Sequence, residues 1–162
     1  MPRFAANLSM LFTEQDFMDR FAAAAQAGFS GVEYLFPYDF PAEQIKAQLD
    51  ANKLTQVLFN LPAGDWAGGE RGIAILPERV EEFRAGVDKA IAYAKVLGNT
   101  QVNCLAGIAP RGADLGQLEI TFIENLRYAA QKLEEAGIRL VMEMINTRDI
   151  PRFFLNNTSQ AQ

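Results

Sequence analysis

The chain has 162 residues, of which 49% are hydrophobic and 22% are charged, a composition that is typical of one globular domain and excludes disordered and collagen-like classes. With 15 basic and 20 acidic residues the net charge is −5, which disfavours a nucleic acid or an anionic membrane as a partner. The absence of histidine excludes the nucleophile systems and the zinc sites that depend on that residue.

A single cysteine, Cys104, excludes an internal disulfide, and we expect it to be a small buried apolar residue. The amino-terminal segment has no apolar stretch followed by a cleavage site, and no apolar run approaches the roughly 18 residues that suggest a membrane span. We therefore expect a single domain over residues 1–162, located in the reducing cytoplasm.

Short apolar runs alternate along the chain with longer stretches whose apolar residues recur at helical spacing, which is typical of parallel βα units. In chain order the pattern predicts a strand over Phe4–Met10, a helix over Thr13–Gly28, a strand over Val32–Phe36, a helix over Pro41–Asn52, a strand over Gln56–Leu61, a helix over Pro77–Gly98, a strand over Gln101–Ala106, a helix over Leu118–Ala136 and a strand over Arg139–Ile145.

Capping residues support the predicted helices. Thr13 is a suitable N-cap, and Pro41 suits a first turn because a proline there removes no helical hydrogen bond. Gly98 is a typical residue at a helix carboxyl terminus. At the end of the sequence, Thr158 and Ser159 predict the first turn of one more helix.

The predicted strands begin about 34 residues apart, as in right-handed βαβ units, which form either a barrel or an open doubly wound sheet. Residues 9–14 contain no glycine, so the phosphate-binding fingerprint is absent after the first strand; a barrel is favoured and no nucleotide cofactor is expected. A closed (β/α)8 barrel needs eight strands and typically about 250 residues. We therefore expect an incomplete TIM barrel whose first and fifth strands have unpaired edges that favour homo-oligomers.

In barrels the loops after the strands carry the active site, so polar residues at strand ends are candidates. Glu143 interrupts an apolar strand, where a buried carboxylate needs a cation, a metal or a proton. The structural alternative is a glutamate held by backbone donors, Arg139 or Arg148. Glu33 interrupts the second strand similarly, although a lone acid is more often a hydrogen-bond acceptor than a ligand. Asn146 is a further candidate, with a turn residue as its alternative.

The connection over residues 60–72 is too long and too rich in glycine for a simple turn and resembles a substrate lid. Trp66 can shield a small polar substrate from water, and Arg71 can hold a substrate carboxylate in a bidentate fork. The alternative is a mobile surface loop with a local pair between Glu70 and Arg71. Asn103 lies near the end of the fourth strand and is another candidate.

Several segments of the chain resemble the hydroxypyruvate isomerase family, within the larger group of xylose-isomerase-like barrels. They are RFAANLSMLF at Arg3–Phe12, GVEYLFPY at Gly31–Tyr38, FNLPAGDWAGGERGIA at Phe59–Ala74, LGNTQVNCLAG at Leu97–Gly107, ENLRYAA at Glu124–Ala130 and MEMIN at Met142–Asn146. The resemblance implies isomerisation of a small hydroxy-keto acid, hydroxypyruvate to tartronate semialdehyde, by proton transfer through an enediolate. The opening MPRFAANLSM also resembles the 2-oxo-tetronate isomerases, which are therefore an alternative.

The resemblance also implies which residues form the site. Glu143 corresponds to the fifth-strand glutamate of the family and is expected both to transfer a proton and to bind a divalent cation, Mg²⁺ or Mn²⁺. The expected substrate-binding residues are Asn7, Asn60, Trp66, Glu70, Arg71, Asn103 and Asn146.

The sequence departs from the family in ways that matter for activity. Many members carry histidine where this chain has Phe59, Thr147 and Phe154, and they carry proline where it has Met144. The second catalytic glutamate of the family and its other metal ligands come from strands six to eight, so we expect residues 1–162 alone to be inactive. From another class, the alternative is a non-catalytic half-barrel that pairs through its edges. An endonuclease of the same barrel group is disfavoured by the negative charge and the lack of histidine.

Overall fold

The computed structural model describes residues 2–161, in which strands and helices alternate along the chain. The elements are β1 (Ala5–Asn7), the short 3-10 helix η1 (Phe17–Asp19), α1 (Arg20–Gln26), β2 (Gly31–Glu33), α2 (Ala42–Asn52), β3 (Thr55–Leu58), η2 (Pro77–Arg79), α3 (Val80–Leu97), β4 (Gln101–Cys104), α4 (Leu115–Glu135), β5 (Arg139–Met142) and η3 (Thr158–Ala161). None of the helices within residues 2–161 is both long enough and apolar enough to cross a membrane.

All strand pairs are parallel and follow the order of the sequence. β1, β2 and β3 form one sheet, and β4 and β5 form another. A bridge between Asn60 and Asn103 continues the first sheet into the second, because Asn103 N donates to Phe59 O at 2.9 Å and Leu61 N donates to Asn103 O at 2.8 Å. The strands therefore form an open barrel wall, and the described residues place no strand beside the outer edge of β1 or β5.

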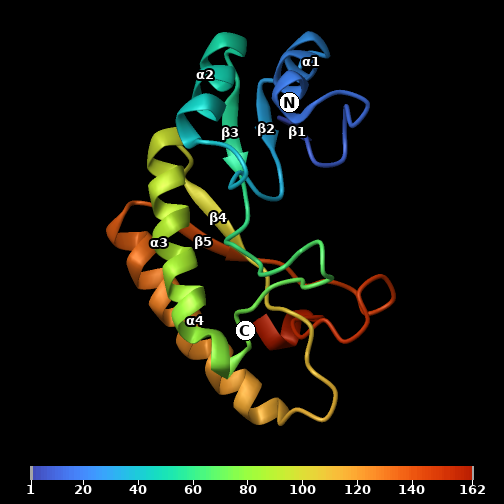
Figure 1. Ribbon diagram of the computed structural model, residues 1–162, viewed down its shortest axis with the longest axis vertical. Coiled ribbons are helices and arrows are strands. Elements are labelled where there is room, and N and C mark those ends of the chain that lie inside the picture. The colour runs from blue at the N-terminus through green and yellow to red at the C-terminus, as the bar shows by residue number, and fades with distance from the viewer. Residues whose placement is uncertain (1, 162) are drawn as a thin grey trace.

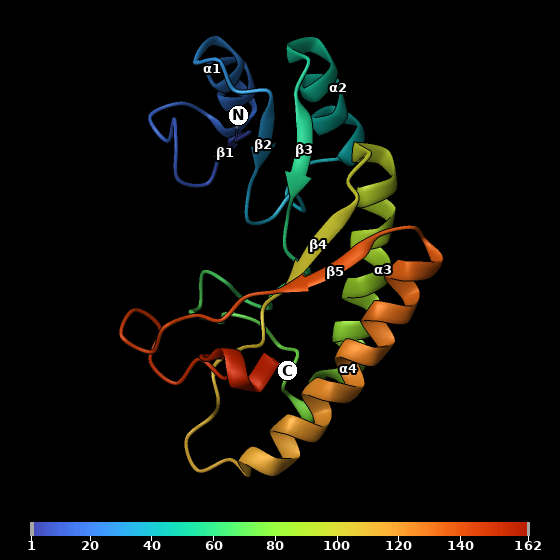
Figure 2. The ribbon, with the colours of Figure 1, turned by 180° about the vertical axis from the view of Figure 1, so that it is seen from behind.

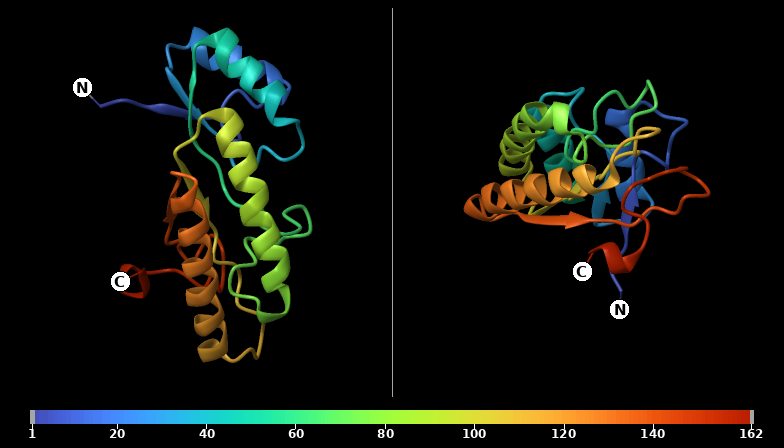
Figure 3. Two further views of the ribbon diagram at one scale, coloured as in Figure 1. Left: turned by 90° about the vertical axis from the view of Figure 1, so that its left-hand side faces the viewer. Right: turned by 90° about the horizontal axis from the view of Figure 1, so that it is seen from below.

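Helices α2, α3 and α4 lie together on one side of the strands (Figure 3), and β3, β4 and β5 lie in front of these helices when the molecule is seen from behind (Figure 2). The helices bury one stripe each toward the strands, with Ile45 of α2, Val87 of α3 and Leu133 of α4 fully buried. The loops after β3, β4 and β5 gather at one end of the molecule (Figure 1). This is the end at which barrels carry their active sites.

The structure confirms an incomplete barrel, and the later helices agree closely with the prediction. α2 begins directly after Pro41, and α3 ends at Gly98, whose φ of 71° lies in the left-handed region. α4 begins at Leu115 rather than Leu118, because Asp114 caps it by accepting hydrogen bonds from the backbone amides of residues 116 and 117. At the predicted last helix, residues 158–161 form a 3-10 turn.

The predicted start of the first helix at Thr13 is wrong. Turns follow β1, with Phe12 at φ 61°, and the α-helix begins at Arg20 after the 3-10 turn η1. The side chain of Arg20 donates to Leu8 O at 2.7 Å and to Gln15 O at 3.0 Å, so it holds this connection against the helix. The strands are also shorter than predicted, because backbone pairing stops before the apolar runs end.

Candidate active site

Each strand presents one polar side chain at or just beyond its carboxyl end. Asn7 and Glu33 end β1 and β2, where they are register partners, and Asn60 follows β3. Asn103 lies in β4, and Glu143 follows β5. All five residues line one cavity of about 220 Å³, together with apolar neighbours. Parallel strands thus collect carboxylates and amides that are far apart in the sequence.

Hydrogen bonds connect these side chains in pairs. Asn7 Nδ2 donates to Glu33 Oε1 at 3.1 Å. Asn103 Nδ2 donates to Asn60 Oδ1 at 2.9 Å and also to Glu143 Oε1 at 3.3 Å. The amide donors therefore orient both carboxylates of the cavity, which leaves the remaining carboxylate oxygens for a ligand.

The side-chain oxygen of Asn103 is buried and has no hydrogen-bond partner among the described residues. Buried polar groups are rarely left without a partner in folded proteins. Since Asn103 lines the cavity between Asn60 and Glu143, an acceptor without a partner stands beside a carboxylate. This arrangement is suited to a small ligand that carries hydroxyl groups.

Tyr34 is the next residue after Glu33, and its side chain packs on the helix side of the wall. Its ring lies edge-on to Phe17 and Phe21, with centroids 5.2 and 6.0 Å away. Burial raises the pKa of its hydroxyl well above the ordinary value, so the hydroxyl stays protonated. Tyr34 therefore supports the wall from behind, while Glu33 faces the cavity.

The expected burial of Glu143 is wrong, because its side chain is exposed. β5 ends at Met142, so Glu143 belongs to the following loop rather than to the strand, and β5 is an edge strand in the described part of the chain. Glu143 nevertheless lines the cavity and contacts Asn103. Neither Arg139 nor Arg148 forms an ion pair with it within residues 2–161.

The long connection after β3 is closed by internal contacts and is not a loose loop. Arg71 Nη1 donates to Trp66 O at 3.0 Å and to Glu70 O at 2.7 Å, and its guanidinium carbon lies 4.0 Å from the centre of the Trp66 ring. Trp66 packs edge-on against Phe36, with ring centroids 5.0 Å apart. Neither Trp66 nor Arg71 lines the Glu143 cavity.

Glu70 and Asn146 serve the local backbone in this structure. The Glu70 carboxylate accepts a hydrogen bond from Asp65 N and pairs with Arg79, so the alternative pair with Arg71 is not formed. Asn146 Oδ1 accepts hydrogen bonds from the backbone amides of residues 148 and 149, each at 3.0 Å. Asn146 therefore acts as a turn residue, which is the alternative given for it in the sequence analysis. Neither side chain lines the Glu143 cavity.

Cys104 is 1% exposed and free, as expected. Burial raises the pKa of its thiol from the ordinary 9.0 to about 12. The thiol is therefore neutral near pH 7 and is not a nucleophile.

The described residues do not fit a metal centre by themselves. Within residues 2–161, no three or more His, Cys, Asp or Glu side chains gather closely enough to hold a metal ion. The cavity has two carboxylates, Glu33 and Glu143, which contact different amides. This part of the chain therefore supplies at most part of a set of cation ligands.

Glu33 belongs to the site more clearly than the sequence pattern indicates. The pattern favours a structural acceptor at this position, because a lone acid in a strand is common. The signal that identifies Glu33 is its place at the end of β2, directly opposite Asn7 at the end of β1. That signal depends on the register of the two strands, which the sequence alone does not fix.

Comparisons with known proteins agree with this architecture. Residues 21–162 match the family described as Xylose isomerase-like TIM barrel. The chain is 57% identical over 161 residues to "Hydroxypyruvate isomerase" of Escherichia coli and 51% identical over 162 residues to "2-oxo-tetronate isomerase" of Cupriavidus necator, and these matches cover 99% and 100% of this chain and 62% of each relative. It therefore spans less than two thirds of the length of these curated relatives.

Solved structures show the same fold. The crystal structure of "AP endonuclease, family 2" from Brucella melitensis superimposes with a TM-score of 0.93 at 53% identity, covering 96% of this chain and 60% of that one. An L-ribulose 3-epimerase, at 20% identity and a TM-score of 0.71, shares the fold over 99% of this chain and 55% of its own. Since the family match extends over most of the sequence and the strands have the parallel order of a barrel wall, the chain belongs to the xylose isomerase-like TIM barrel family.

Proposed function

We propose that this chain forms one wall of an aldose–ketose isomerase of the hydroxypyruvate isomerase type, which interconverts hydroxypyruvate and tartronate semialdehyde. The observation that carries the proposal is the carboxylate of Glu143, held by Asn103 in a cavity at the carboxyl ends of parallel strands. The 57% identical E. coli relative named hydroxypyruvate isomerase supports the same assignment.

The proposed chemistry is a proton transfer between adjacent carbons. Glu143, which accepts a hydrogen bond from Asn103 on one oxygen, takes the proton from C3 of hydroxypyruvate with its other oxygen. The resulting enediolate receives that proton at C2, while the hydroxyl proton moves from O3 to O2. Asn103 Oδ1, which has no partner among the described residues, accepts a hydrogen bond from a substrate hydroxyl.

Arg71 is the residue we assign to the substrate carboxylate. Its Nη1 is occupied by two backbone carbonyls, whereas its Nε and Nη2 make no hydrogen bond to the described residues. Guanidinium groups bind carboxylates through two parallel hydrogen bonds. Arg71 does not line the Glu143 cavity in this structure, but its loop follows β3 and lies with the loop after β5 at the same end of the strands.

A divalent cation is compatible with this proton transfer. Mg²⁺ or Mn²⁺ would take Glu143 as one oxygen ligand and would need its other ligands from outside residues 2–161. We also propose a cytoplasmic location and no nucleic acid partner. The Brucella protein is named as an endonuclease, but a net charge of −5 and the absence of histidine do not support that activity for this chain.

A second candidate is 2-oxo-tetronate isomerisation, which has the same chemistry on a substrate one carbon longer. The relative of that name from C. necator is 51% identical, close to the value for the hydroxypyruvate isomerase. Assaying both substrates in parallel separates the two activities by their kcat/KM.

The test combines this chain with the carboxyl-terminal remainder of the E. coli relative, co-expressed as a separate polypeptide. We expect the chain alone to be inactive. We expect the pair of polypeptides to exchange the C3 proton of hydroxypyruvate for deuterium from D₂O, and NMR measures this exchange. In the pair, Glu143→Gln is expected to lower kcat by at least about a thousandfold. Because Glu143 is exposed, the same change leaves the unfolding free energy of the chain within about 0.5 kcal/mol.

Glu119→Gln is the matched control, since Glu119 is an exposed glutamate of α4 outside the Glu143 cavity, and it is expected to keep full activity. Turnover by the unaccompanied chain would contradict the proposed incompleteness. Undiminished turnover in Glu143→Gln would remove Glu143 from the mechanism.

A further inference from the structure

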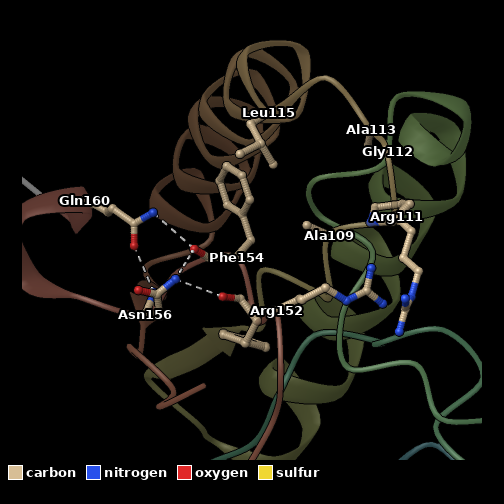
Figure 4. A pocket seen from close by; sticks show the side chains of 11 residues that line it. Ala109, Arg111, Gly112, Ala113, Leu115, Arg152, Phe154, Asn156 and Gln160 are labelled. Atoms are coloured by element: carbon tan, nitrogen blue, oxygen red, sulfur yellow. Dashed lines mark hydrogen bonds between the residues drawn. The ribbon is translucent and has the colours of Figure 1, made fainter. Parts of the chain in front are cut away.

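A second cavity, of about 610 Å³, lies between the loop after β4 and the segment over residues 152–160 (Figure 4). It shares no lining residue with the Glu143 cavity. Backbone bonds hold its two sides together: Ala109 N donates to Arg152 O at 3.0 Å, and Phe154 N donates to Gly107 O at 2.9 Å. The cavity is therefore a built part of this end of the molecule.

Within the part of the chain that the structure describes, two arginines and no acidic residue line this cavity. Arg111 comes from one side and Arg152 from the other, and Figure 4 shows the Arg111 side chain extending downward and the Arg152 side chain extending to the right. Neither guanidinium forms an ion pair within residues 2–161. The neighbouring acid, Asp114, is occupied by capping α4. Although the net charge of the chain is −5, two guanidinium groups without a neighbouring carboxylate make the potential at this cavity locally positive, so the cavity favours an anion.

The backbone of Arg152 adopts a conformation that is unfavourable for its residue type. Its φ is 65°, in the left-handed region that glycine and asparagine adopt at lower energy. The bond from Ala109 N to its carbonyl fixes this conformation and thereby the direction in which the side chain leaves the loop. Strained backbone at a charged side chain beside a cavity is typical of a binding site.

The rest of the lining is apolar or already engaged. Leu115, 60% exposed, and Phe154 form an apolar wall. The amides of Asn156 and Gln160 are occupied by neighbouring carbonyls: Asn156 Nδ2 donates to Phe153 O at 3.0 Å, and Gln160 Nε2 donates to Phe154 O at 3.1 Å. Among the described lining residues, the guanidinium groups of Arg111 and Arg152 are therefore the side-chain hydrogen-bond donors that remain available to a ligand.

We propose that this cavity binds a phosphate monoester whose organic group is apolar. The dianionic phosphate pairs with Arg111 and Arg152, because guanidinium groups match phosphate oxygens in number and geometry. The organic group packs against Leu115 and Phe154. The site is separate from Glu143, so the proposal does not depend on isomerase activity.

Isothermal titration calorimetry of the 162-residue chain at low ionic strength tests the site, with phenyl phosphate and inorganic phosphate as probes. Phenyl phosphate is expected to bind more tightly than inorganic phosphate, because it also uses the apolar wall. Arg111→Gln and Arg152→Gln are each expected to weaken both probes by about tenfold. The control Arg148→Gln removes an equal charge from the loop after β5 at a residue outside the cavity, and leaves the affinities unchanged.

A second pair of variants tests the apolar wall. Leu115→Ser is expected to weaken phenyl phosphate several-fold and to leave inorganic phosphate unchanged. Ile120→Ser, at an exposed position of the same helix outside the cavity, is expected to change neither. Circular dichroism checks that each variant is folded. The proposal is overturned if neither probe binds at millimolar concentration, or if Arg148→Gln weakens binding as much as Arg111→Gln and Arg152→Gln.

Discussion

Asn103 and Cys104 are neighbours in β4 with opposite environments. Successive side chains of a strand point to opposite faces, so Asn103 lines the Glu143 cavity while Cys104 lies in the core. The amide of Asn103 connects Asn60 to Glu143 and retains one oxygen without a partner among the described residues. One strand thus separates a polar interior face, suited to a ligand, from an apolar face that supports the helices.

Cys104 gives the unfolding free energy a defined pH dependence. Burial raises the pKa of its thiol from 9.0 to about 12, so the folded chain keeps this proton at pH values where the unfolded chain loses it. The stabilisation is complete below pH 9 and is lost as the pH rises toward 12. The expected slope from this group is up to about −1.4 kcal/mol per pH unit.

Urea denaturation at about pH 8, 9 and 10 measures this slope, and Cys104→Ala is expected to reduce it. Tyr34, whose pKa is also raised by burial, ordinarily titrates near 10.0 and is present in both proteins, so it cancels in the comparison. Parallel curves for the two proteins would show that the thiol is accessible to solvent in the folded chain.

At the scale of elements, the connection after β3 is joined firmly to the elements around it. Gly72, at φ 117°, packs so closely on the next loop that a Cβ atom would lie 2.2 Å from Leu105 O. Asn125 of α4 donates from Nδ2 to Ala74 O at 2.8 Å. Arg79 connects Glu70 in the loop to Glu82 in α3, where its hydrogen bonds lower the pKa of Glu82. The loop that positions Trp66 and Arg71 is therefore anchored at several points.

We expect Arg79→Ala to loosen this loop without unfolding the chain. The change removes the partner of Glu70 and is expected to cost about 1 kcal/mol, since these side chains are partly exposed. Trp66 is the single tryptophan of the chain, so its emission reports on the loop directly. Emission should move to longer wavelength as Trp66 becomes hydrated.

Arg84→Ala is the matched control, because Arg84 lies on α3, five residues after Arg79, and pairs with the exposed Glu81. It is expected to leave the emission maximum unchanged. An unchanged maximum in Arg79→Ala as well would mean that the stack of Trp66 on Phe36 and Arg71 holds the loop without Arg79.

Sequence periodicity predicted the long helices well, because α3 and α4 bury one stripe each and are followed by Gly98 and Gly137, both at positive φ. The start of α4 was placed three residues late, at Leu118, because Asp114 was not identified as its cap. Periodicity did not predict strand ends, because the apolar character of the fifth strand continues past Met142, where pairing with β4 stops. This is why Glu143 was expected to be buried. The start of α1 was missed for a similar reason, since a possible cap at Thr13 does not exclude a turn.

The candidate site was predictable in part. Polar residues at strand ends identified Asn103 and Glu143, because parallel topology brings such positions together. The role of Glu70 was not predictable, since its partner Arg79 lies in another element nine residues away. A charged residue in a loop has many possible partners. Which of them lies within ion-pair distance depends on the folded path of the loop, which the sequence alone does not give.

At the scale of the whole molecule, the open wall leaves strand edges and apolar side chains exposed. Met142, the last residue of β5, and Met144, two residues after it, are 37% and 41% exposed, and Phe4, before β1, is 73% exposed. Unpaired edges with apolar neighbours favour pairing with another chain. The same edges would accept the strands that complete the barrel in the co-expression experiment, so self-association and completion compete for one surface.

We therefore predict that the isolated chain self-associates through its β5 edge. Sedimentation velocity is expected to show a weight-average mass that rises with concentration. The double variant Met142→Lys/Met144→Lys is expected to lower this association, because lysines at a strand edge oppose pairing. The control Ile120→Lys adds a charge at an exposed residue of α4, away from the edge, and should leave association unchanged. A monomer at all concentrations would show that the edge is protected in solution, whereas equal effects of edge and control variants would assign the association to net charge.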